Sequence, residues 1–101
     1  MGYVLYDFLD SGNGYKCRLT LKALGIPYEY RFIDIIKGES RTAEYLAINP
    51  NGKIPVLVVP DRGPLAESHA IISYLAEGSF LVPADRYERA AEFYEVVTAL
   101  W

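Results

Sequence analysis

The chain is poor in the residues on which metal and disulfide chemistry depend. Its 101 residues include one cysteine, Cys17, and one histidine, His69. A single cysteine cannot form an internal disulfide, and one cysteine with one histidine is too few for the usual ligand sets of zinc. We therefore expect no metal, no disulfide framework and a reducing, cytoplasmic location.

Positive charge is also scarce. The sequence has 10 Lys and Arg against 13 Asp and Glu, which gives a formal net charge of −3, and no basic cluster occurs. Since nucleic acids and anionic membranes bind clustered Lys and Arg, we expect neither as a partner. No apolar run approaches the roughly 20 residues of a membrane-spanning helix. The first seven residues lack the basic stretch of a signal peptide.

What remains is the composition of one small globular domain, 51% hydrophobic and 23% charged. Residues rich in β-branched and aromatic types predict strands at 3–8, 28–34, 53–59 and 65–66. Apolar residues at helical spacing predict helices from the turn at 10–14 to Leu24, at 42–47, at 68–77, where Ser68 is the expected N-cap, and at 84–101. The order β-α-β-α-β-β-α indicates an α/β fold with a mixed four-stranded sheet and a right-handed first crossover.

Several motifs occur in a distinctive order. They are S-G-N-G-Y-K at 11–16, L-G-I-P-Y-E at 24–29, N-P-N-G-K-I-P-V-L at 49–57, L-A-E-S-H-A-I-I at 65–72 and L-V-P-A-D at 81–85. In this arrangement the chain resembles the N-terminal, thioredoxin-fold domain of a bacterial glutathione S-transferase of the Ser-x-Asn-Gly type. The resemblance implies a thioredoxin-like domain over residues 1–80. It also implies that 81–101 are a linker and the first helix of an all-helical second domain.

The resemblance assigns one part of a glutathione site to Lys53, Ile54 and Pro55. It implies a cis peptide between Ile54 and Pro55, which would turn the Ile54 backbone outward to pair with the cysteinyl part of glutathione. Lys53 would meet the glycine carboxylate. The alternatives are that Pro55 simply begins a strand and that Lys53 is a solvated surface lysine.

A second part of the implied site is Glu67 and Ser68. The Ser68 hydroxyl and the N–H groups that begin the next helix would bind the γ-glutamyl carboxylate, and Glu67 would bind its ammonium. The alternative is an ordinary N-cap preceded by an exposed acid.

The residues implied as catalytic are Asn13, with Ser11 assisting. Hydrogen-bond donors beside a helix N-terminus would stabilise the glutathione thiolate, the reactive form of the thiol. The alternative is that both residues only form the turn and cap the helix. Cys17 lies on the apolar stripe with Leu21 and predicts a buried, inert thiol, whereas His69 is expected to be exposed and non-catalytic.

Three functions fit the sequence. The favoured one is a glutathione-dependent enzyme that acts on a small electrophile, a disulfide or a peroxide. The resemblance also implies a homodimer. The second is a transferase-like interaction or regulatory module without catalysis. The third, a glutaredoxin-type oxidoreductase, is disfavoured by the missing C-x-x-C motif. An apolar stripe in 84–101, containing Tyr94 and Trp101, predicts an interface.

Overall fold

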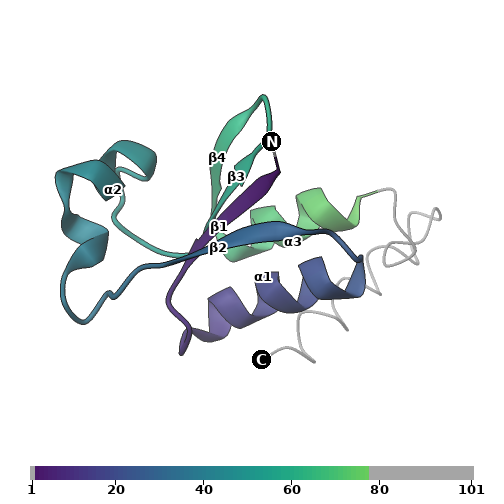
Figure 1. Cartoon of the computed structure of the whole chain (residues 1–101), viewed down its shortest axis with the longest axis horizontal. Helices are drawn as coiled ribbons and strands as arrows, with labels where there is room; N and C mark the ends of the chain where they lie inside the picture. The colour runs from purple at the N-terminus through teal and green to yellow at the C-terminus, as the bar shows by residue number, and fades with distance from the viewer. Residues whose placement is uncertain (1, 78–101) are drawn as a thin grey trace.

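The structure, a computed structural model, describes residues 2–77. Its elements follow the predicted order β-α-β-α-β-β-α, with a short 3₁₀ helix added before the second α-helix (Figure 1). They are β1 (Tyr3–Asp7), α1 (Gly12–Ala23), β2 (Tyr28–Phe32), the 3₁₀ helix η1 (Glu39–Arg41), α2 (Ala43–Ile48), β3 (Val56–Val59), β4 (Gly63–Ala66) and α3 (Ser68–Ala76). The predicted thioredoxin-like α/β fold is thus confirmed. The helix and linker predicted within 81–101 lie outside the described residues.

The four strands form one mixed sheet in the order β2-β1-β3-β4. β1 and β2 are parallel, as the helical crossover through α1 requires, while β3 pairs antiparallel with both β1 and β4. The register sets Tyr6 opposite Val56, and Val56 opposite Ala66. The chain segments that follow β1 and β4 and precede β3 are therefore brought to one end of the sheet.

The core lies between one face of the sheet and the pair of helices α1 and α3 (Figure 1). Leu5 and Leu57 from the sheet are fully buried against Cys17 and Leu21 of α1 and Ile71 of α3. These side chains come from every second strand residue and from positions three to four apart in the helices. The helical spacing is the pattern that the sequence predicted. α2 and η1 pack on each other and stand apart from the α1–α3 pair (Figure 1).

Helix α1 ends where the sequence places its stop signal. Gly25 has φ of 67°, and its N–H donates to the Lys22 carbonyl at 3.1 Å. The Ile26 N–H donates to the Leu21 carbonyl at 3.0 Å, which completes a Schellman motif. Pro27 follows and prevents further helix. The chain therefore reverses sharply and enters β2 alongside β1.

Three predicted strands are shorter in the structure, β1 by its last residue only. β2 ends at Phe32 because the Asp34 side chain accepts the N–H groups of Ile36 and Lys37, which turns the chain. β3 begins at Val56, after Pro55, which has no N–H to donate to a ladder. β4 is an edge strand and contains Pro64 opposite Val58.

None of the helices in 2–77 is long and apolar enough to span a bilayer.

Candidate functional site

A cavity of about 140 Å³ opens at the end of the sheet where α1 and α3 begin. It draws its lining from three separate stretches of chain. The lining residues are Asn13, Asn49, Asn51, Lys53, Ile54, Pro55, Ala66, Glu67 and Ser68. The antiparallel β3–β4 register explains this convergence, because pairing of Val56 with Ala66 carries Ile54 and Pro55 toward Glu67 and Ser68.

Ile54 presents main-chain groups at this cavity. The Ile54–Pro55 peptide is cis, as the sequence motif predicted. Within residues 2–77 the Ile54 N–H and carbonyl take part in no backbone hydrogen bond. Pro55 itself is buried and forms the floor from which β3 begins. Ile54 therefore offers one donor and one acceptor to an extended ligand, in the manner of an added strand.

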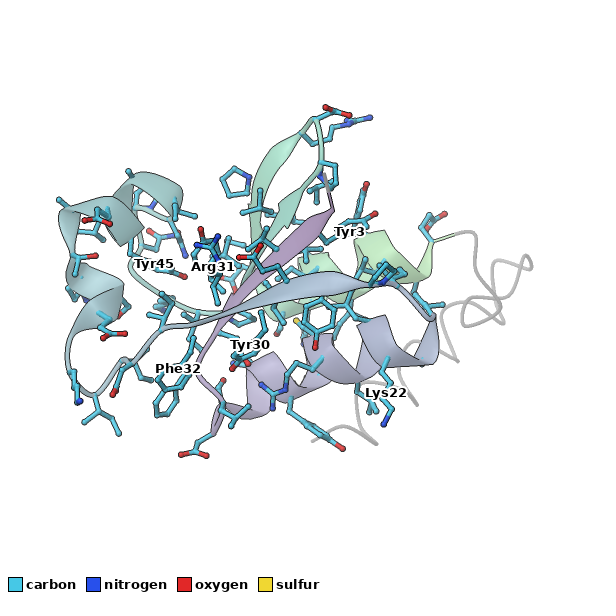
Figure 2. The ribbon with its side chains drawn as sticks, in the orientation of Figure 1. Tyr3, Lys22, Tyr30, Arg31, Phe32 and Tyr45 are labelled. Atoms are coloured by element: carbon cyan, nitrogen blue, oxygen red, sulfur yellow. The ribbon has the colours of Figure 1, made fainter. Side chains whose placement is uncertain are left out.

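The peptide group before Ile54 is held from α2 and the turn that follows it. The Tyr45 hydroxyl donates to the Lys53 carbonyl at 2.6 Å, and the Asn49 side-chain N–H donates to the same oxygen at 2.9 Å. Figure 2 shows Tyr45 on the side of α2 that faces the sheet, where its ring packs edge-on against Tyr6. The Lys53 side chain is exposed, so its ammonium is available to an anion.

Glu67 and Ser68 meet at the start of α3. Glu67 has φ of 75° and ψ of 123°, a region that side-chain-bearing residues rarely occupy. The structure corrects the predicted cap: Glu67 is the N-cap residue, without a side-chain capping bond, and the buried Ser68 is the first helical residue. The reason is the unusual Glu67 backbone, which lets the helix start at Ser68, one residue earlier than it would with Ser68 as cap. The first N–H groups of α3 therefore face the cavity end without a side-chain cap.

The start of α1 contains the other predicted pair. Ser11 is the N-cap residue, and its hydroxyl oxygen accepts the Gly14 N–H at 3.2 Å. Ser11 is not among the lining residues, whereas Asn13 is. Asn13 lies inside the first turn of α1 rather than before the helix, because helical geometry begins at Gly12. The Lys16 ammonium lies 3.4 Å from Asn13 Oδ1, and since an ammonium only donates, the Asn13 N–H₂ group is left to face elsewhere.

Beneath this turn lies a buried carboxylate that the sequence did not reveal. Asp7 is fully buried, and its Oδ2 accepts from the Arg18 guanidinium and, at 3.1 Å, from the Tyr30 hydroxyl. Its Oδ1 has no hydrogen-bond partner among the described residues and points at Gly14, where a Cβ atom would come within 1.6 Å. Burial raises the pKa of the Asp7 carboxyl, an effect that Arg18 and Tyr30 only partly offset. Figure 2 shows Tyr30 on β2, above α1.

Cys17 and His69 lie outside the lining of the cavity. Cys17 is fully buried in the core, and burial raises the pKa of its thiol to about 12, so it stays a neutral thiol. His69 is exposed, as predicted, and does not line the cavity.

Six of the seven predicted site residues thus line one cavity: Asn13, Lys53, Ile54, Pro55, Glu67 and Ser68. Sequence reasoning missed Asn49 and Asn51 as lining residues and Tyr45 as a support. The N-P-N-G turn was visible as a motif, but the direction of the two asparagine side chains depends on how the turn folds back on α2.

Comparison with known protein families gives one clear match. Residues 11–77 match the model described as the glutathione S-transferase N-terminal domain. A curated relative, glutathione S-transferase 1 of Dianthus caryophyllus, is 40% identical over 92 residues, which are 88% of this chain and 41% of the relative.

Solved structures agree with this match. A glutathione S-transferase from Pseudomonas fluorescens Pf-5 superposes with a TM-score of 0.83 at 46% identity, covering 89% of this chain and 45% of that one. The glutathione transferase URE2P6 from Phanerochaete chrysosporium, in complex with oxidized glutathione, gives a TM-score of 0.77 at 36% identity, over 86% of this chain and 43% of that one. The chain therefore spans less than half the length of these relatives.

Proposed function

Because the chain belongs to the glutathione S-transferase family and forms its N-terminal domain, we propose that the cavity binds glutathione as co-substrate. The observation that carries this proposal is the gathering of six predicted contact residues, from three stretches of chain, around one cavity. Glutathione is a tripeptide with two carboxylates, an ammonium and a thiol, and the cavity offers groups of matching chemistry.

The γ-glutamyl end of glutathione would lie at the start of α3. The Ser68 hydroxyl and the N–H groups that begin α3 are donors to a carboxylate, and the helix dipole favours negative charge there. The Glu67 carboxylate, exposed beside them, would pair with the ammonium. The two opposite charges of one amino acid would therefore find two complementary groups on neighbouring residues.

The rest of the tripeptide would extend across Ile54 toward Lys53. The free Ile54 N–H and carbonyl would pair with the main chain of the cysteinyl residue. The exposed Lys53 ammonium would attract the glycine carboxylate. This direction leaves the thiol at the α1 side of the cavity, where Asn13 lies.

Asn13 would activate the thiol, with Ser11 assisting. The Asn13 N–H₂ group, oriented by the contact of its oxygen with Lys16, would donate to the thiolate and lower its pKa. The Ser11 oxygen is engaged by Gly14, but its hydroxyl hydrogen is left to donate. In conjugation, the thiolate sulfur forms a bond to an electrophilic carbon, the leaving group departs with the electron pair of its broken bond, and the thiol proton passes to solvent.

Calorimetric titration of the intact protein with glutathione tests the binding site. Glu67→Ala and Ser68→Ala should each weaken binding about tenfold or more, because each removes a charge-assisted hydrogen bond. Ser73→Ala, on the exposed side of the same helix, and Glu44→Ala, an exposed acid of α2, are matched controls that should bind as the unsubstituted protein does. Unchanged affinity in both cavity variants would remove Glu67 and Ser68 from the site.

Thiol activation has its own measurement. The ultraviolet absorbance of the bound thiolate, followed against pH, should show a thiol pKa that rises by about one unit in Asn13→Ala and by less in Ser11→Ala. An unchanged titration curve in both variants would leave them as turn and cap residues. Glutathione binding without turnover of an aryl halide, or of a small disulfide other than that of glutathione itself, would favour the non-catalytic module instead.

For the intact protein we propose a cytoplasmic homodimer whose second substrate is a small electrophile or a disulfide. Exposed apolar side chains support a further contact surface on this domain, among them Leu9 and Tyr15 beside the start of α1. Sedimentation of the intact protein at low concentration would test the dimer.

A further inference from the structure

The Lys53–Ile54 peptide group is anchored on one side only. Its carbonyl oxygen receives two donors, the Tyr45 hydroxyl at 2.6 Å and the Asn49 side-chain N–H at 2.9 Å. Both lone pairs of this oxygen are thereby engaged. The other polar group of the same peptide is the Ile54 N–H, which has no backbone partner within residues 2–77.

The geometry of a trans peptide links these two ends. Carbonyl and N–H lie on opposite sides of the rigid peptide plane, so fixing the direction of the oxygen fixes the direction of the N–H. Two donors from the α2 side therefore hold the Ile54 N–H pointing away from α2. Without them, the peptide plane could rotate about its flanking single bonds.

Asn49 begins the turn that leads to Lys53, and its side chain bonds to two later residues of that turn. It is 5% exposed, its Oδ1 accepts the Asn51 N–H at 3.1 Å, and its backbone carbonyl accepts the Gly52 N–H at 2.9 Å. The Asn49 side-chain oxygen and one of its side-chain N–H groups are thus directed at the turn. Tyr45 is 2% exposed, and burial raises the pKa of its hydroxyl to about 12, so it remains a donor at neutral pH.

We propose that Asn49 and Tyr45 are positioning residues, which aim the Ile54 N–H at the glutathione main chain by holding the Lys53 carbonyl. This inference rests on the proposed function, since it assigns these residues to that same site. Neither residue needs to touch glutathione. Their effect is on the orientation of a group that does.

Substitutions that remove one donor at a time test this role. Tyr45→Phe deletes only the hydroxyl, and Asn49→Ala deletes the side-chain amide. Each should weaken glutathione binding by roughly two- to tenfold, the range of one hydrogen bond, and the double variant should weaken it further. Thr42→Ala is the matched control, because Thr42 caps α2 by accepting the Tyr45 N–H at 3.1 Å yet makes no contact with Lys53.

The readout is a titration with glutathione followed by calorimetry and by the ¹⁵N–¹H signal of the Ile54 amide. In the unsubstituted protein and in Thr42→Ala, we expect a downfield shift of the Ile54 amide proton at saturation, with affinities within twofold of each other. In Tyr45→Phe and Asn49→Ala, we expect weaker binding and a smaller shift at saturation. A role in α2 stability alone would lower the melting temperature of all three variants without changing the saturated Ile54 signal.

Equal affinity and equal Ile54 shifts in Tyr45→Phe and the unsubstituted protein would overturn the inference while the proposed function stands. A loss of affinity in Thr42→Ala as large as in Asn49→Ala would also overturn it. Failure of the unsubstituted protein to bind glutathione would overturn both the inference and the proposed function. Tyr45→Phe, which keeps the buried ring, decides the matter should Asn49→Ala not fold.

Discussion

Replacing Gly14 with alanine should destabilise the domain, although alanine is the better helix former. Gly14 lies in the first turn of α1, and there the exchange of glycine for alanine favours a helix by about 1 kcal/mol. Against this, the new Cβ would lie 1.6 Å from Asp7 Oδ1 and 2.3 Å from Asp7 Cγ. The carboxylate must therefore move, or the turn of helix must.

The cost follows from what holds Asp7. The carboxylate is fully buried and bonded to Arg18 and Tyr30, so it cannot retreat without weakening an ion pair and a hydrogen bond. Overpacking a core typically costs about 1–3 kcal/mol, and breaking a buried ion pair costs about 3–5 kcal/mol. Part of the overpacking cost and part of the ion-pair cost, reduced by the gain in helix preference, give a net destabilisation of about 2–4 kcal/mol. For a domain of this size the melting temperature should fall by about 8 °C or more.

Gly12 provides the matched control. It lies in the same turn of α1, is exposed, and has no atom within 4 Å of a Cβ built on it. Thermal unfolding followed by far-ultraviolet circular dichroism should show Gly12→Ala as stable as the unsubstituted protein or slightly more so. A Gly14→Ala protein that melts at or above the unsubstituted temperature would refute the reasoning, since propensity would then outweigh the contact with Asp7.

Two further predictions concern strained or buried groups of the same region. Because burial raises the pKa of the Asp7 carboxyl above its ordinary value of 3.8, the stability that this group contributes is fully present below that value and is lost as the pH rises through the raised pKa. The free energy of unfolding of the unsubstituted protein, measured against that of Asp7→Asn in urea titrations, should therefore fall as the pH rises above 3.8, and a difference that grows with pH would contradict this. Glu67→Gly should relieve the backbone at φ of 75° and raise the stability by up to about 1 kcal/mol while glutathione affinity falls. Asp61→Gly is also at positive φ but away from the cavity, and it should raise stability without changing glutathione affinity. Equal glutathione affinity in Glu67→Gly and Asp61→Gly would argue against a ligand role for Glu67.

Much of the fold could be predicted because its signals are local. The stripe of Cys17 and Leu21, the stop at Gly25 and the β-branched and aromatic residues of β1 each involve neighbours within a few residues. Most lining residues of the cavity could also be predicted, because they belong to motifs of fixed spacing.

Other features depend on partners far apart in the sequence and left no readable pattern. Asp7 meets Arg18 and Tyr30 only after the α1 crossover has formed, and Lys16, an ordinary surface residue by type, is buried. Nothing in the residue type of Glu67 indicates a positive φ, so the sequence predicts the cap of α3 at Ser68, whereas the structure has it at Glu67. The direction of the Asn49 side chain likewise follows from the tertiary position of Lys53.

The two outer strands of the sheet also affect the tendency of the domain to aggregate at high concentration. An outer strand exposes unpaired N–H and carbonyl groups, which can recruit a strand of another molecule and begin aggregation. In β4, Pro64 lacks an N–H and so interrupts the row of donors. In β2, Glu29 and Arg31 form an exposed ion pair (Arg31 is labelled in Figure 2). A proline and a pair of charges thus act as gatekeepers at opposite edges, so that the apolar strands β1 and β3 stay shielded from intermolecular pairing.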